Sequence, residues 1–180
     1  MKKLLMILPL VILLYFTFGC QDKEAMAELE EFRAQAEVEE QNKELIRNLF
    51  KEWNNRNIDI LNELYAPNAK FYHPTGGTTP ISLEKAIEMI KMNWQAFPDL
   101  ILTIEDLIAK GDKVVIRFIG RGTHKGEFGS IPATGIKCEA GAIEICRIED
   151  GKIVEAWEIS DTLGLLIQLG MELKPKAGEK

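Results

Sequence analysis

Histidine is scarce in this sequence. His73 and His124 are the only two among 180 residues, so sites that hold a metal ion through several histidines are excluded, and we expect no metal site. The patterns G-x-S-x-G and H-E-x-x-H are missing, as is a phosphate-binding glycine motif. These absences exclude the common serine-hydrolase, zinc-protease and nucleotide-binding designs.

Positive charge is also in short supply. The net charge is −6 and the isoelectric point is near 5.1, whereas a nucleic-acid partner calls for a basic face. We therefore expect no nucleic-acid partner. The hydrophobic fraction of 46% and the charged fraction of 28% are ordinary for a globular protein. The length allows one domain with a real core plus extensions.

The longest uncharged run is too short for an ordinary membrane span. Leu4–Gly19 has 16 uncharged residues, and a spanning helix needs about 20. Lys2 and Lys3 precede the run, and Gly19-Cys20 ends it before a polar stretch. This arrangement resembles a bacterial lipoprotein signal, which predicts that residues 1–19 are removed and Cys20 is lipidated. The mature chain would then carry a net charge of −8 and lie in the cell envelope, outside the cytoplasm and anchored to the membrane by lipid. An uncleaved anchor and an ordinary secretory signal are the alternatives.

Cysteine is rare, and its spacing excludes a local disulfide. Cys138 and Cys146 lie in one expected strand, which separates them by about 26 Å at 3.3 Å per residue. A disulfide requires Cα atoms less than about 7 Å apart. We expect two free, mostly buried thiols without a redox role.

The remaining chain divides into three parts. Residues 20–41 contain eight acidic residues and two basic ones, and they lack glycine and proline. This composition predicts a solvated helical tether. Residues 42–173 carry the periodic apolar patterns of a folded domain, and residues 174–180 form a polar tail.

Within the domain, helices come first and strands follow. The apolar spacing predicts a helix up to Trp53 and a short helix ended by Pro67. It then predicts a strand at Ala69–His73, a loop at Pro74–Gly77 and a helix capped by Ser82. Four antiparallel strands follow, and a closing helix ends the domain; the expected ranges are 100–108, 113–123, 136–149, 152–160 and 162–169. This order indicates an α+β fold, in which a curved antiparallel sheet is closed by N-terminal helices into a cone with an internal pocket.

Four stretches of the domain carry a resemblance to a known family. They are Leu64–Pro74 (LYAPNAKFYHP), Gly122–Gly135 (GTHKGEFGSIPATG), Ile148–Trp157 (IEDGKIVEAW) and Asp161–Gly170 (DTLGLLIQLG). With them, the chain resembles the SnoaL-like polyketide cyclase, or ester cyclase, family, whose members share the cone-shaped fold of nuclear-transport-factor-two-like domains. The resemblance implies an aldol-type ring closure by acid/base catalysis, without a metal or organic cofactor.

The resemblance also implies roles for single residues. Asp161 matches the carboxylate that serves as general acid/base after the last strand. His73 matches a histidine that lines the family pocket, and Trp157 matches a tryptophan that precedes the catalytic aspartate. Many relatives carry a histidine where this chain has Ala156, so one polar pocket group of the family is missing here.

Asp161 has two interpretations. As a base it needs a pKa well above the usual value of about 3.9, which desolvation by apolar walls such as Phe71 and Trp157 would provide. However, Ser160-Asp161-Thr162 before an apolar run is also a helix N-cap signature. A cap would lower the pKa of Asp161, which is the opposite of what a base requires.

The other candidates also have alternatives. His73 either orients a substrate carbonyl or is a structural histidine at the pocket edge. His124 lies in a glycine-rich loop, where we expect partial exposure and a contact with substrate. Glu127 in the same loop is either a second pocket carboxylate or a solvated loop charge.

Three functions fit these patterns. The first is a cofactor-free catalyst of acid/base chemistry on a small apolar carbonyl compound. The second is a surface lipoprotein that binds a small hydrophobic molecule without reacting with it. The third is an interaction module that uses the open sheet face to form a homodimer or to dock a partner.

Overall fold

The computed structural model describes residues 2–73, 79–172 and 174, and within 2–22 it describes the backbone helix but not the side chains. The chain divides into two compact units, Met1–Val38 and Glu39–Lys180. The fold and the candidate site belong to the second unit. The expected loop Pro74–Gly77 and the tail beyond Lys174 lie outside the described residues.

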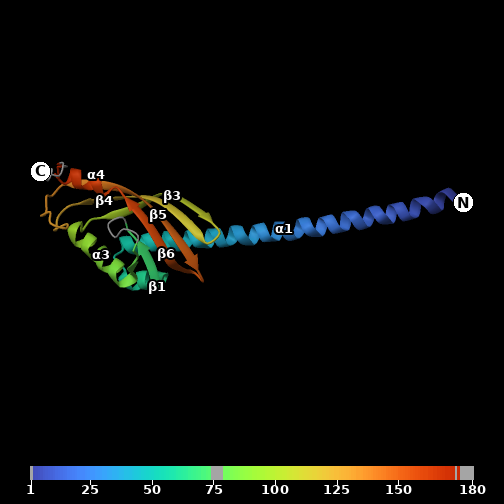
Figure 1. Ribbon diagram of the computed structural model, residues 1–180, viewed down its shortest axis with the longest axis horizontal. Coiled ribbons are helices and arrows are strands. Elements are labelled where there is room, and N and C mark those ends of the chain that lie inside the picture. Colours follow the sequence, from blue (N-terminus) through green and yellow to red (C-terminus); the bar gives the residue numbers. More distant parts are fainter. Residues whose placement is uncertain (1, 74–78, 173, 175–180) are drawn as a thin grey trace, which may run out of the picture. The chain divides into compact units, whose positions relative to one another are not determined.

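The described elements confirm the α+β class (Figure 1). There are four helices and six strands among the described residues: α1 Lys2–Asn54, α2 Ile58–Leu64, β1 Tyr65–Tyr72, β2 Ile81–Ser82, α3 Leu83–Ala96, β3 Ile101–Lys110, β4 Lys113–Thr123, β5 Lys137–Glu149, β6 Lys152–Ser160 and α4 Thr162–Gln168. As expected, the hydroxyl of Ser82 caps α3 by accepting a hydrogen bond from the backbone N–H of Lys85.

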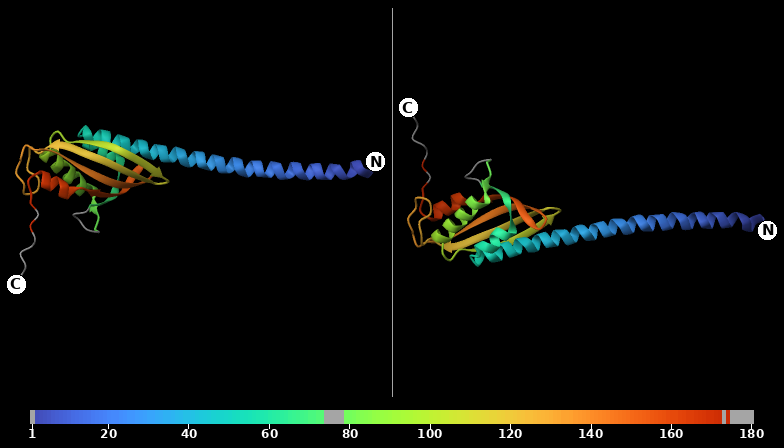
Figure 2. Two further views of the ribbon diagram at one scale, coloured as in Figure 1. Left: turned by 90° about the horizontal axis from the view of Figure 1, so that it is seen from above. Right: turned by 90° about the horizontal axis from the view of Figure 1, so that it is seen from below.

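The strands form one curved sheet in the order β2-β1-β6-β5-β4-β3 (Figure 2). Strands β3 to β6 make the predicted antiparallel meander. The hairpin between β5 and β6 turns at Asp150 and Gly151, both of which have positive φ, as a tight two-residue turn requires. One pairing was not foreseen, because β1 lies parallel to β6.

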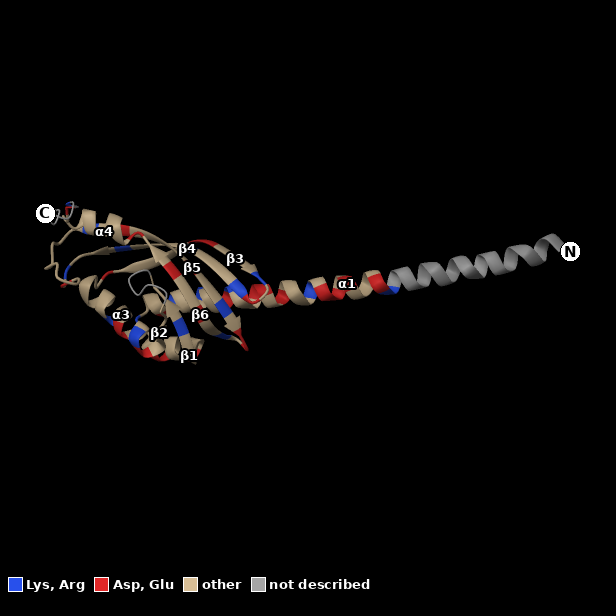
Figure 3. Cartoon of the chain, in the orientation of Figure 1, with Lys and Arg blue, Asp and Glu red and all other residues tan. Residues whose placement is uncertain are grey.

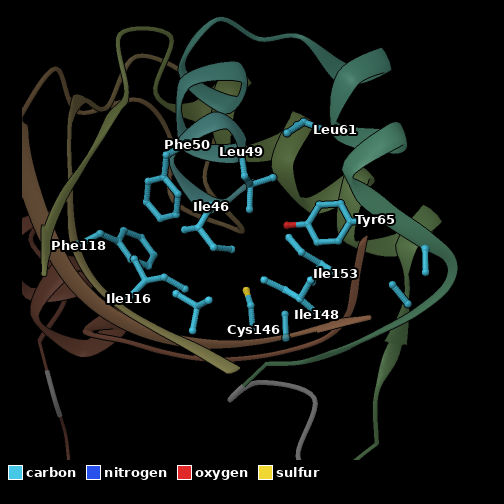
Figure 4. Close-up of a cluster of buried hydrophobic side chains, with 14 of the residues drawn as sticks. Ile46, Leu49, Phe50, Leu61, Tyr65, Ile116, Phe118, Cys146, Ile148 and Ile153 are labelled. Carbon is cyan, nitrogen blue, oxygen red and sulfur yellow. The ribbon is translucent and has the colours of Figure 1, made fainter. Parts of the chain in front are cut away.

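The core lies on the concave face of this sheet. Figure 4 shows Ile46, Leu49 and Phe50 of α1 pointing towards Ile116 and Cys146 of the sheet. All five side chains are buried. Burial of each such side chain contributes about 1.5–3 kcal/mol, so the C-terminal part of α1 is an integral part of the domain.

The first strand is longer than the sequence suggested. We expected Pro67 to end a helix and the strand to begin at Ala69, but the helix ends at Leu64 and β1 begins at Tyr65. Proline lacks the N–H that a ladder needs. Accordingly, the pairing of β1 with β6 is irregular between Tyr65 and Lys70, which is where Pro67 lies.

The first unit is helical and acidic. From Lys23 to Val38 every side chain except that of Gln35 is exposed, and Figure 3 shows Asp and Glu spaced along this part of α1. No helix among the described residues is long and apolar enough to cross a membrane. Cys20 lies in the segment whose side chains are not described.

Cys138 and Cys146 are free thiols, as predicted from their spacing in one strand. Cys146 is fully buried and Cys138 is half-buried.

Candidate functional site

The concave face of the sheet encloses a cavity with two connected chambers. The inner chamber has a volume of about 200 Å³ and the outer one about 580 Å³. They share wall residues from α3, β3, β4 and β6 and from the positions just after β1 and just before β3, namely His73, Met89, Asn93, Leu100, Leu102, Phe118 and Glu158. A molecule lying along both chambers would therefore touch most elements of the domain.

The inner chamber has aromatic walls. Its rings come from α1, β1 and β4: Phe50, Trp53, Tyr65, Phe71, Tyr72 and Phe118. Edge-to-face contacts hold these rings in place, with centroids 5.0 Å apart for both Phe50–Phe118 and Tyr65–Phe71. Phe71, which we predicted as a pocket wall, is one of these rings.

The outer chamber is wider because small residues line its sheet side. Gly120 and Gly122 of β4 face Ala140 and Cys138 of β5 in register, and all four residues line the chamber. The opposite walls are flexible or apolar and come from α3, α4 and the loop before β5; they include Met89, Met92, Phe128, Ile131, Leu165 and Leu166. Thioether side chains adapt to ligands of varied shape.

Two carboxyl groups stand side by side in this cavity. Glu144 of β5 and Glu158 of β6 are directly opposed in the antiparallel ladder. Glu158 lines both chambers, and Glu144 lines the inner one. Cross-strand neighbours have Cβ atoms about 4.5–5.5 Å apart, and two like charges at that separation repel. The pair therefore favours a state with one proton bound.

The pKa values of the pair follow from this environment. Burial in the apolar chamber, followed by the charge of Glu158, raises the pKa of Glu144 to about 8. Burial also raises the pKa of Glu158, while attraction to His73 and a hydrogen bond from Ser160 oppose that rise. With a pKa of about 8, Glu144 holds a proton at neutral pH.

The sequence analysis missed both glutamates, and a bulge explains one of them. In the ladder between β5 and β6, Arg147 pairs with Glu155 but Ile148 pairs with Ile153, so Val154 is an extra residue. This residue shifts the alternation, so that Ile153, Ala156 and Glu158 share the inner face. Counting every second residue from Ile153 leads to Trp157 and Ile159. Such a count places Glu158 on the outer face, whereas in the structure it lies on the inner face.

Glu144 was missed because the outer face of β5 is apolar. Ile143 and Ile145 flank it and are 50% and 36% exposed, although their type suggests burial. The signal that remained was the buried pair Ala142 and Cys146, which lie two residues away from Glu144 on either side. The thiol of Cys146 donates a hydrogen bond to Glu144 Oε1 at 3.5 Å.

Asp161 lies at the junction of β6 and α4, as predicted, but its carboxylate caps the helix. Asp161 Oδ1 accepts a hydrogen bond of 2.8 Å from the backbone N–H of Gly164. Asp161 is exposed and is not among the described residues that line either chamber. The geometry thus matches the N-cap alternative.

His73 is the predicted site residue that the structure brings to the carboxyl pair. It follows the last residue of β1, lines both chambers and interacts electrostatically with Glu158. Trp157 instead stacks on Tyr72, with ring centroids 5.3 Å apart, and so supports a wall residue.

His124 is fully buried, in contrast to the partial exposure that its loop suggested. Its Nδ1 lies 3.0 Å from the hydroxyl of Thr134 and accepts the N–H of Thr134, and its ring packs against Phe97. These contacts join the two ends of the loop that walls the outer chamber. Glu127 lies on that loop and lines the outer chamber.

No three His, Cys, Asp or Glu side chains in the described part of the chain converge closely enough to hold a metal ion.

A curved sheet with helices on its concave face and a cavity between them defines a nuclear-transport-factor-two-like cone. The chain belongs to the SnoaL-like polyketide cyclase family, whose profile matches residues 43–169. No curated protein matches the chain.

Solved structures agree with this assignment. AclR from Streptomyces galilaeus, described as a proposed hydroxylase, is 27% identical over 77% of this chain and 87% of its own, with a TM-score of 0.70. IdmH from Streptomyces antibioticus, described as a proposed polyketide cyclase, is 35% identical over 72% of this chain and 99% of its own, with a TM-score of 0.67. A SnoaL-like protein from Jannaschia, at 22% identity, 76% and 96% coverage and a TM-score of 0.68, shares the fold.

Proposed function

We propose that this protein is an acid/base catalyst that acts, without a cofactor, on a small apolar carbonyl compound held in the two-chamber cavity. One observation carries the proposal. Glu144 and Glu158 are paired across adjacent strands inside an apolar chamber, where burial raises the pKa of both. Two carboxyl groups that repel each other at this distance share one proton, and such a pair supplies an acid and a base at the same pH.

The carboxyl pair divides the reaction into two roles. Glu158, whose ionised form is favoured by His73 and Ser160, removes a proton from the carbon next to the carbonyl group. Glu144, which holds its proton at neutral pH, donates a hydrogen bond to the carbonyl oxygen as negative charge develops there. The enolate carbon then forms a bond with a second carbonyl carbon of the same molecule, and the proton on Glu158 passes to the new alkoxide oxygen.

The aromatic walls contribute by shape and by excluding water. A positioned general base typically accounts for 10²–10⁴-fold of a rate enhancement. Holding the two reacting carbons in contact accounts for a further part. The inner chamber is small enough that a bound ketone would leave little room for solvent beside the carboxyl pair.

Exchange of substrate hydrogen with solvent tests the proposal without knowledge of the natural substrate. The domain is incubated in D₂O with a small apolar 1,3-diketone, and deuterium entering the carbon between the carbonyls is followed by NMR. We expect the wild-type domain to accelerate exchange and Glu158→Gln to lower the enzymatic rate by about 10²-fold or more.

Glu155→Gln is the matched control, because Glu155 lies on the same strand and pairs with Arg147 on the outer face. Its exchange rate should equal that of the wild type. Wild-type exchange no faster than in buffer, or a Glu158→Gln rate equal to that of Glu155→Gln, contradicts the catalytic role.

A binding protein that does not catalyse is the second candidate. It is favoured by the missing pocket histidine at Ala156, which lines the inner chamber. In that case the diketone binds, as shown by chemical-shift changes of residues such as Phe71, but takes up deuterium no faster than it does in buffer.

We also propose that the chain is a lipoprotein attached to the membrane through Cys20. The charged start, the uncharged run and Gly19-Cys20 support this. Mass spectrometry of the protein extracted from the cell envelope should show a chain that begins at Cys20 and carries a diacylglyceryl group. An unmodified full-length chain would contradict the proposal.

A further inference from the structure

The cavity has a one-sided charge. No lysine or arginine is among the described residues that line either chamber. The described walls carry Glu127, Glu139, Glu144 and Glu158, of which Glu139 is paired with Arg121, and one histidine, His73. A bound carboxylate or phosphate would find no lysine or arginine on these described walls, and it would lie beside the carboxyl pair.

The aromatic rings of the inner chamber add to this preference. Phe50, Tyr65 and Phe71 line the same chamber as Glu144. Trp53 lines it too, but the Arg56 guanidinium already lies 5.6 Å from the centroid of its ring. The face of an aromatic ring carries partial negative charge, and a cation near such a face is attracted, most strongly where water is excluded. Carboxyl groups and aromatic rings in one chamber thus provide two attractions for the same charge.

We infer that this cavity also binds a hydrophobic amine, whose protonated nitrogen lies between Glu144 and Glu158 in the inner chamber and whose apolar body fills the outer chamber. The inference goes beyond the proposed function. The amine is a second ligand of the same site and not the substrate of the proposed reaction, because its ammonium group displaces the Glu144 proton that the reaction uses.

Binding of a protonated amine has a consequence that binding of an alcohol lacks. The pair holds a proton at neutral pH because the pKa of Glu144 is raised to about 8. A neighbouring ammonium group lowers that pKa, so the proton leaves as the amine enters. The other titratable groups of the described residues that face the pair are Tyr65 of β1, His73 just after β1, and Cys146 of β5.

Three probes of one chain length test the inference: n-octylamine, 1-octanol and octanoate. Their affinities for the domain are measured by calorimetry at about pH 7, where the amine is cationic and the acid anionic. We expect octylamine to bind about tenfold more tightly than octanol, and octanoate to bind most weakly. We also expect the heat of amine binding to vary with the ionisation enthalpy of the buffer, because a proton is released.

Variants separate the carboxyl pair from general hydrophobic binding. Glu144→Gln and Glu158→Gln should each remove most of the difference between amine and alcohol and leave octanol affinity unchanged. Glu155→Gln should behave as the wild type, since Glu155 pairs with Arg147 outside the cavity. The inference is overturned if octylamine binds no more tightly than octanol. It is also overturned if the double variant, Glu144→Gln combined with Glu158→Gln, still prefers the amine.

The outcome is independent of the exchange assay. A preference for octylamine without acceleration of diketone exchange supports the amine site and contradicts the catalytic proposal. Acceleration of diketone exchange without a preference for octylamine supports the catalytic proposal and contradicts the amine site.

Discussion

At the scale of single residues, Glu144 ties the stability of the domain to pH. The ordinary pKa of a glutamate is about 4.3, and the buried position raises the pKa of Glu144 to about 8. Between these values the folded chain holds a proton that the unfolded chain has released. The free energy of unfolding therefore falls as pH rises through this window.

This predicts a measurable slope. Between about pH 5 and pH 8, the free energy of unfolding of the wild-type domain should fall by up to about 1.4 kcal/mol per pH unit. Glu144→Gln should flatten the curve, because glutamine does not titrate. Urea unfolding at several pH values measures the effect.

Glu155→Gln should retain the slope, since Glu155 forms an ion pair of 2.5 Å with Arg147 on the outer face. A wild-type stability that is constant or rises from pH 5 to pH 8 would refute the assignment of the raised pKa.

Asp161 gives a second prediction at this scale. Asparagine caps helices as well as aspartate does, so Asp161→Asn should leave thermal stability and diketone exchange close to the wild type. Asp161→Ala should lose about 1 kcal/mol through the lost hydrogen bond to Gly164. If Asp161→Asn instead slows exchange by about 10²-fold with normal stability, Asp161 is the base after all.

Whether a single residue could be predicted to belong to the site depended on how clearly the sequence shows which face of its strand it occupies. His73 was found because it matches a histidine that lines the pocket of the family that the chain resembles. Glu144 and Glu158 were not, because apolar Ile143 and Ile145 occupy the exposed face and a bulge at Val154 shifts the alternation. Both effects arise from packing between strands, which no short window of sequence contains.

At the scale of elements, α4 forms a wall of the outer chamber, and one of its side chains forms hydrogen bonds with β5. Gln168 Nε2 donates a hydrogen bond of 2.8 Å to the carbonyl of Glu139, and its Oε1 accepts the N–H of Glu139 at 3.0 Å. The amide thus pairs with β5 as a neighbouring strand would. Leu165 and Leu166 of the same helix line the chamber.

Gln168→Ala should therefore loosen α4. We expect hydrogen exchange at the amides of Leu165 and Leu166 to speed up by up to about 30-fold, since two hydrogen bonds worth about 1 kcal/mol each are lost. The affinity for octanol should fall with it. Gln95→Ala on the exposed side of α3 is the control, and equal exchange in the two variants would show that Gln168 does not hold the helix.

Most elements were predictable from local signals. Asp150-Gly151 marked a hairpin, Ser82 marked a helix start, and the alternation of Lys113–Thr123 marked a strand. The start of strand β1 was predicted too far along the chain, because a proline such as Pro67 cannot donate a hydrogen bond to a neighbouring strand. In the structure the strand includes Pro67, and its pairing with β6 is irregular there. The two-residue strand β2 pairs with β1 alone, so it has no periodic signal of its own.

At the scale of the whole molecule, the outer face of the sheet is unusually apolar. Ile108, Ile143, Ile145 and Ile159 are 64%, 50%, 36% and 68% exposed, and Ile143 pairs with Ile159 across β5 and β6. Charged residues on this face are paired with one another, as Arg117 is with Asp106. An exposed apolar patch with neutralised charges is suited to a second copy of itself.

We therefore expect the domain to dimerise through this face. Sedimentation velocity of residues 21–180 should show a dimer at micromolar concentration, and Ile159→Lys should yield a folded monomer. Lys70→Ala, at an exposed position on β1, is a control that should remain dimeric. A wild-type monomer across the micromolar range would exclude this interface.

The central claim is that Glu144 and Glu158 form the acid/base centre of the cavity. Its most direct test is the titration of their side-chain carboxyl carbons by NMR in the soluble domain, assigned with Glu144→Gln and Glu158→Gln. The structure predicts that Glu144 titrates near 8 and that replacing Glu158 lowers this pKa, because the repulsion is removed. If both carboxyl groups instead titrate near the ordinary glutamate value of about 4.3, the pair is solvated and the account is wrong.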